Sequence, residues 1–127
     1  LASPMTMAAV IGSVQEGALV VPRLVEQVKV SDHDHTPLTE AEAAQLQAML
    51  RAVVTDGSGA QLADVPGEPV IAKTGTAEFV GEGGGVQTHA WMVAAQGDLA
   101  VAVFVEIGES GSRTAGPILE EFLRDRS

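Results

Sequence analysis

The dipeptide Gly97-Asp98 joins two apolar segments of the chain, Thr88–Gln96 and Leu99–Ile107. Branched and aromatic residues in both segments favour β-strands, and a two-residue connection that contains glycine favours antiparallel pairing between them. A third strand is predicted over Val70–Thr74, and Gly81–Gly85 is predicted to be a flexible loop. The second half of the chain is therefore expected to fold as an antiparallel β meander.

The first half begins with a segment of helical periodicity. Residues 3–16 are predicted to form a helix. Ser3 can cap its N-terminus, Pro4 suits its first position, and Gly17 can end it. The next segment, Leu19–Val30, is expected to be extended because β-branched residues dominate it.

Two more helices are predicted from their start signals. Thr39 and Glu42 have the spacing of a capping box, which begins a helix that ends near Thr55. The last helix is expected from about Thr114, and its apolar stripe contains Ala115, Ile118, Leu119 and Phe122. The order helix, helix, three strands, helix predicts an α+β fold in which helices cover the antiparallel meander.

Composition limits the class of protein. The 127 residues have room for one domain, and the apolar fraction of 46% is ordinary for a globular protein. A net charge of −10 without a Lys/Arg cluster argues against nucleic acid as a partner. The sequence has no apolar run of about 18 residues and no signal peptide, and it begins with Leu1. We expect that it is part of a longer protein.

The segment Lys73-Thr74-Gly75-Thr76 is the strongest functional signal. A Lys-Thr-Gly triplet on a strand is one of three sequence marks of the penicillin-recognising serine acyltransferases. Of the other two, Ser-x-x-Lys does not occur, because Glu26 and Val70 stand three residues before the two lysines, Lys29 and Lys73, and Ser-x-Asn does not occur either. The sequence therefore predicts one wall of an active site without its nucleophile.

Nearly the whole chain resembles, in order, the C-terminal part of the transpeptidase domain of class B penicillin-binding proteins. The matching motifs resemble the family's "TPLQMA", "NGG…PRLV", "M…VV..GTG", "GKTGTAE" and "HAWF" patterns, followed by its last strand and helix. They lie at Ser3–Ala8, Glu16–Ala18 with Val21–Val25, Met49–Gly59, Ala72–Glu78, His89–Met92, Leu99–Glu106 and Ala115–Ile118. Ser58 stands where the family's Gly-Thr-Gly turn has threonine. The resemblance implies that residues 1–127 are the C-terminal portion of one transpeptidase domain.

The resemblance also implies roles for individual residues. Lys73 and Thr76 would be catalytic: Lys73 adds positive charge, and the backbone N–H of Thr76 is one oxyanion donor. Thr74, Gly75 and Thr76 would bind substrate, since the threonine hydroxyls hold a carboxylate and Gly75 lets the substrate backbone approach. The implied function is the substrate- and penicillin-binding wall of a D,D-transpeptidase that cross-links peptidoglycan, inactive alone.

The implied partners are the peptidoglycan stem peptide and β-lactams, together with the rest of the parent domain or a second copy of the chain. Self-association is expected because the strand Leu99–Ile107 would have one unpaired edge. The implied location is the extracytoplasmic face of the bacterial cell membrane, reached through an N-terminal anchor outside this sequence. No metal or cofactor is expected.

Several alternatives stay open. The chain could belong to a serine β-lactamase or a D,D-carboxypeptidase, or be a non-catalytic β-lactam sensor that keeps the fold. Trp91 is interpreted as a core residue, and His89 as a structural histidine that could approach the active-site rim. The segment Asp32-His33-Asp34-His35 resembles a metal cluster, but a solvated loop is favoured because no rigid frame fixes its geometry.

Overall fold

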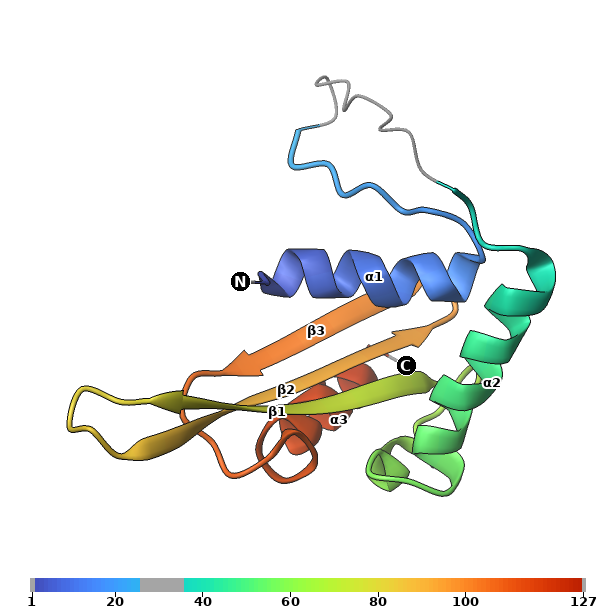
Figure 1. Cartoon of the computed structure of the whole chain (residues 1–127). Helices are drawn as coiled ribbons and strands as arrows, with labels where there is room; N and C mark the ends of the chain where they lie inside the picture. Colours follow the sequence, from blue (N-terminus) through green and yellow to red (C-terminus); the bar gives the residue numbers. More distant parts are fainter. Residues whose placement is uncertain (1, 26–35, 127) are drawn as a thin grey trace.

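The computed structural model describes residues 2–25 and 36–126. Within these ranges the chain forms an α+β fold of three α-helices around a three-stranded antiparallel sheet (Figure 1), which confirms the predicted fold class. The elements in chain order are α1 (Pro4–Glu16), α2 (Glu40–Thr55), a short 3₁₀ turn η1 (Ala60–Leu62), β1 (Ile71–Val80), β2 (Val86–Gln96), β3 (Leu99–Val105), a π-helical turn η2 (Gly111–Ala115) and α3 (Gly116–Asp125).

The sheet is a meander with the strand order β1-β2-β3. Gly97 has a φ of 58°, which suits the two-residue turn between β2 and β3 and favours glycine. The register places Gly75 of β1 opposite Trp91 of β2, and Trp91 opposite Phe104 of β3. Both outer strands therefore present one edge that no other described strand covers.

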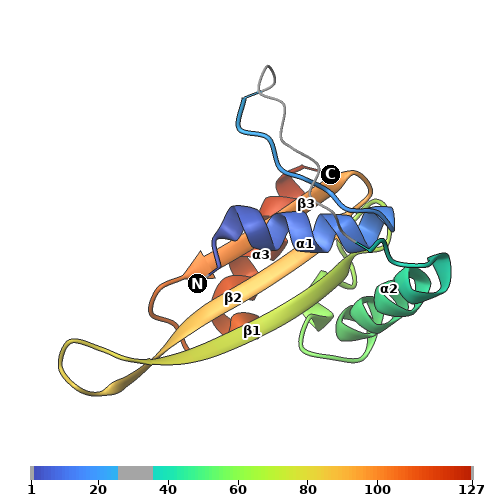
Figure 2. The same cartoon turned by 45° about the horizontal axis from the view of Figure 1, so that its top comes forward.

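The two faces of the sheet pack against different helices. Helix α1 crosses one face, while α3 and η2 cover the other, and α2 lies against the beginning of β1 (Figures 1 and 2). The core on the α3 face is the larger, and it includes the fully buried Met92, Leu62 and Leu119. The smaller core on the α1 face is built on Ile11 and Val93. Both faces of β2 are thus buried.

The predicted signals for helices α1 and α2 are confirmed. The Ser3 side chain accepts a hydrogen bond from the Thr6 N–H, and Gly17 ends α1 in the left-handed conformation with a φ of 68°. At the start of α2, the Thr39 side chain accepts from the Glu42 N–H while the Glu42 carboxylate accepts from the Thr39 N–H. The Thr39 N–H and the Thr39 hydroxyl both donate to the Glu42 carboxylate, and they lower the pKa of Glu42, with the backbone donor as the larger cause.

The strands depart from the prediction at their ends. The strand predicted over Val70–Thr74 is wrong in length, because β1 runs from Ile71 to Val80 and pairs with β2 along its whole length. Gly75 does not end the strand, since it is paired with Trp91 of β2. Strand β3 ends at Val105 rather than Ile107.

The expected extended segment after α1 is not a strand where it is described. Residues 19–25 contain no regular structure, because no neighbouring strand pairs with them. The remainder of that segment, residues 26–30, lies outside the described residues.

The predicted start of the last helix also needs correction. A π-helical turn occupies Gly111–Ala115, and the α-helix begins only at Gly116. The predicted stripe is partly wrong: Ile118 and Phe122 are 49% and 41% exposed, and the buried side of α3 is formed by Leu119 and Leu123. The extra residue of a π-helical turn rotates the following helix relative to a continuous α-helical repeat, so the stripe shifts.

Candidate active-site wall

The segment Lys73–Thr76 lies inside β1, at the open edge of the sheet. In a hairpin closed by a two-residue turn, the flanking residues Gln96 and Leu99 form a hydrogen-bonded pair, and such pairs then alternate along the ladder. With the continuous register of β1 on β2, the alternation directs the backbone N–H and C=O of Thr74 and Thr76 away from β2. The main-chain groups of both threonines therefore face the open edge.

Lys73 and the threonines occupy opposite faces of the sheet. Lys73 and Gly75 lie on the face that α1 covers, whereas Thr74 and Thr76 lie on the face of α3 and η2. The Lys73 side chain is exposed, and its Nζ donates to the carbonyl oxygen of Thr74 at 2.7 Å. This contact places the positive charge at the same edge as the outward-facing carbonyl.

The hydroxyl of Thr74 meets a residue from another element. Its Oγ1 lies 2.6 Å from the Oγ of Ser58, in the turn that follows α2. That turn is fixed to α2 by the Gly59 N–H, which donates to the Val53 carbonyl at 2.9 Å. Helix α2 is in turn tied to the start of β1, because Arg51 Nη1 donates to the Val70 carbonyl at 2.7 Å.

The π-helical turn η2 contacts both Thr76 and Gly75. The N–H of Gly111 donates to Thr76 Oγ1 at 3.3 Å. A Cβ on Gly111 would lie 2.3 Å from the carbonyl oxygen of Trp91 and 2.8 Å from the backbone N and O of Gly75. Only glycine therefore fits at position 111 with the two backbones this close.

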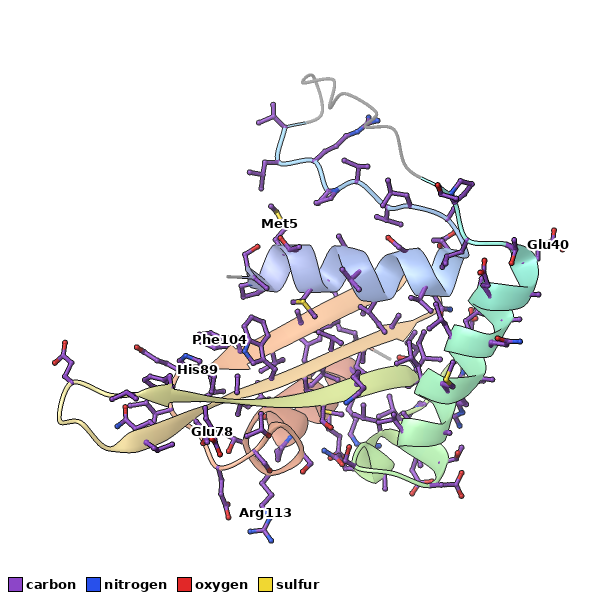
Figure 3. All side chains as sticks on the ribbon, in the orientation of Figure 1. Met5, Glu40, Glu78, His89, Phe104 and Arg113 are labelled. Atoms are coloured by element: carbon purple, nitrogen blue, oxygen red, sulfur yellow. The ribbon has the colours of Figure 1, made fainter. Side chains whose placement is uncertain are left out.

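A pocket of about 460 Å³ opens on the α1 face beside Lys73. Its walls are mostly apolar and aromatic, and Figure 3 shows His89 and Phe104 beneath the N-terminal part of α1. The lining includes Met7 of α1, Lys73, Gly75 and Ala77 of β1, His89 and Trp91 of β2, and Phe104 of β3.

The aromatic residues of this pocket form a continuous row across the sheet. His89 stacks on Phe79 with ring centroids 4.0 Å apart, and Trp91 lies 4.5 Å from Phe104. His89 Nδ1 also lies 2.6 Å from the carbonyl oxygen of Glu106, which fixes its ring. His89 is thus both held by its neighbours and part of the pocket wall. Trp91 is half-buried rather than a core residue, because Gly75 opposite it offers no side chain to cover the ring.

The sequence singled out Lys73, Thr74, Gly75 and Thr76, and the structure places them on one edge. The sequence did not indicate that Gly111 or Ser58 contacts this segment. The signal for Ser58 was a hydroxyl between two glycines, Gly57 and Gly59, in the turn after α2. For Gly111 the only signal was its place in a Gly/Ser-rich stretch before the last helix.

The described residues contain no group of three or more His, Asp or Glu side chains that could hold a metal ion. The segment 32–35, weighed above as a metal cluster, lies outside the described residues. Among the described helices, none combines the length and the apolar character needed to cross a membrane.

The arrangement can bind an extended, anionic ligand. Outward-facing N–H and C=O groups on Thr74 and Thr76 can pair with a peptide backbone as an added strand. Two hydroxyls and the Lys73 ammonium group lie at the same edge, and all three can donate hydrogen bonds to a carboxylate.

Comparison with known proteins gives one family. The model of the penicillin-binding protein transpeptidase domain matches residues 1–124. No curated protein matches the chain. This family consists of serine acyltransferase-type enzymes. The chain belongs to the family of penicillin-binding protein transpeptidase domains.

Proposed function

We propose that this chain forms the substrate- and penicillin-binding wall of a D,D-transpeptidase that cross-links peptidoglycan. Family membership supports penicillin-binding-protein-type function. The observation that carries the finer assignment is the open edge of β1, where Thr74 and Thr76 offer main-chain groups and hydroxyls beside the Lys73 amine. A stem peptide or a β-lactam with a free carboxylate matches these donors.

The wall has a defined part in acyl transfer. A serine hydroxyl attacks the ligand carbonyl, its proton passes to a base, and the carbonyl oxygen becomes an oxyanion. The Thr76 N–H stabilises that oxyanion, a contribution of about 3 kcal/mol for one donor. The positive charge of Lys73 stabilises the negative charge on the ligand. The sequence holds no Ser-x-x-Lys, so the nucleophile comes from outside these 127 residues and the chain alone is inactive. In this proposal the parent protein acts on the cell-wall side of the membrane.

The first prediction concerns acylation by penicillin. In the full-length protein that carries this chain, Lys73→Ala should slow acylation by about a hundredfold or more. The melting temperature should stay nearly unchanged, because the Lys73 side chain is exposed and its ammonium group donates to the Thr74 carbonyl of its own strand. The measurements are stopped-flow acylation with a labelled penicillin and a thermal unfolding scan.

The matched control is Arg113→Ala, which removes an exposed charge whose partner is Glu109 on the surface. It should leave acylation unchanged. The 127-residue chain alone should acquire no penicillin adduct by mass spectrometry. An adduct on any serine of the isolated chain, or wild-type acylation by Lys73→Ala, would contradict the proposal. Hydrolysis of the penicillin with fast turnover would instead indicate a β-lactamase.

A further inference from the structure

We infer that Ser58 is a positioning residue, which acts through the Thr74 hydroxyl to direct its proton toward the carboxylate of a ligand on β1. The inference deepens the proposed function and rests on it. It starts from the 2.6 Å contact between Ser58 Oγ and Thr74 Oγ1, which joins the turn after α2 to the Lys-Thr-Gly-Thr segment.

The position of Ser58 is set by backbone contacts rather than by its own side chain. The Gly59 N–H donates to the Val53 carbonyl, and the Gly59 carbonyl accepts from the Leu62 N–H, both at 2.9 Å. A Cβ on Gly57 would lie 2.9 Å from the Val53 carbonyl oxygen, so the turn is tightly folded onto the end of α2. Because the backbone of this turn is fixed, the Ser58 hydroxyl is held at the position where it contacts Thr74 of β1.

Helix α2 also fixes where β1 lies relative to Ser58. Arg51 of α2 donates to the carbonyl oxygen of Val70, four residues before Thr74. Helix α2 therefore contacts the residue before β1 through Arg51, and the turn that follows α2 contacts Thr74 through Ser58. This double contact gives Thr74 a defined rotamer, since its hydroxyl has one partner at a fixed place.

The direction of the hydrogen bond follows from what a carboxylate requires. A hydroxyl has one proton and two acceptor positions, and a carboxylate only accepts. When Ser58 donates to Thr74, the Thr74 proton is left for the ligand and is made a stronger donor by the bond it accepts. Thr76 is arranged in the same way, because its oxygen accepts from the Gly111 N–H and its proton stays available.

The experiment uses the full-length protein and compares single and double variants. Ser58→Ala should reduce the second-order rate of acylation by a penicillin about tenfold, the effect of one hydrogen bond to a group that binds a charge. Ser58→Thr keeps the hydroxyl and should restore the rate. In a Thr74→Val background, Ser58→Ala should have no further effect, because the group through which it acts is gone. With the methyl ester of the same penicillin, the effect of Ser58→Ala should also disappear.

The matched control is Thr55→Ala, in the last turn of α2. Thr55 bonds only within its own segment, to the Arg51 carbonyl and the Asp56 carboxylate, so its loss should not change acylation. Three results would overturn the inference: unchanged acylation by Ser58→Ala, additive losses in the double variant, or an equal loss with the ester. An unsubstituted protein that no penicillin acylates would overturn the proposed function itself, and the inference with it.

Discussion

Gly111 of the π-helical turn packs closely on the backbone of the sheet where η2 meets β1. Gly75 lies opposite Trp91 in the sheet, and Gly111 packs on the backbone of both residues. Because Gly111 has no side chain, its backbone approaches the backbones of Gly75 and Trp91 more closely than any other residue would allow. The contact brings the Gly111 N–H to the hydroxyl of Thr76.

This contact gives a prediction at the residue scale. Gly111→Ala should destabilise the full-length protein by about 1–3 kcal/mol, because the new methyl group would meet backbone atoms at 2.3–2.8 Å and force η2 away from β1. Acylation should slow as well, since the Gly111–Thr76 hydrogen bond is lost. Denaturant unfolding and stopped-flow acylation measure the two effects.

The control for this variant is Gly83→Ala in the hairpin between β1 and β2. A Cβ at that position has no atom within 4 Å, and Gly83 is not among the glycines with positive φ. Stability should therefore stay the same or rise slightly. An equal loss of stability in both variants would show that the close contact at Gly111 has no special role.

At the scale of elements, the helix ends were predictable because their signals are local. Ser3 and Gly17 bound α1, and Thr39 with Glu42 begins α2, through contacts within three or four residues. The length of β1 was not predictable, because residues 75–80 are held in the strand by pairing with β2 residues that lie 6 to 16 positions away. The π-helical turn before α3 also depends on tertiary contact, that of Gly111 with β1.

The residues of the candidate site also separate into those that the sequence could predict and those that it could not. The Lys73–Thr76 segment and its place on a strand followed from sequence, because the motif is contiguous. Its partners did not, since Ser58 and Gly111 lie 16 and 35 residues from the threonines they contact. The pocket on the α1 face brings together four elements, and no local pattern specifies such a convergence.

The capping box of α2 gives a prediction with a pH dependence. The folded-state pKa of Glu42 is below its unfolded value, so the unfolded state binds a proton more readily. The hydrogen bonds of the Glu42 carboxylate therefore stabilise the helix fully above the unfolded-state pKa of Glu42. This stabilisation is lost as the pH falls through the folded-state pKa of Glu42. In a peptide spanning residues 37–56, Thr39→Ala should reduce helicity at pH 7, and the difference from the parent peptide should shrink as the solution is acidified.

Circular dichroism between pH 7 and pH 2 tests this. The control peptide carries Glu42→Gln, which keeps a hydrogen-bond acceptor but does not titrate. In this background the effect of Thr39→Ala should not change with pH. A pH-dependent effect in the glutamine peptide would assign the titration to another carboxylate of the segment.

At the scale of the whole molecule, the outer edge of β3 carries backbone N–H and C=O groups that no described strand pairs. The ladder alternation pairs Leu99, Val101 and Val103 with β2 and directs the backbone groups of Ala100, Ala102 and Phe104 outward. Phe104 is also 38% exposed at this edge. Such an edge can pair with a strand of the parent domain or of a second copy.

We predict that the 127-residue chain, expressed alone, is not a stable monomer. Light scattering at micromolar concentration should show association. Hydrogen exchange should then show protected amides at Ala100, Ala102 and Phe104, which the added strand would bond. The amides of Leu99, Val101 and Val103 are the internal control, since β2 protects them in any state. A monodisperse monomer whose outward amides exchange freely would rule out this association.

The glycine contact beside the Lys-Thr-Gly-Thr segment also affects how an inhibitor can be evaded. In the proposed function, a ligand along the edge of β1 would bind main-chain atoms, which no substitution removes. Gly111 cannot gain a side chain without moving the backbone of β1, on which substrate binding would depend in the proposed function. Substitutions that weaken inhibitor binding are then confined to side chains around the edge of β1, such as Ser58 and the aromatic residues of the pocket. An inhibitor that depends on the main chain alone leaves this part of the protein few routes to resistance.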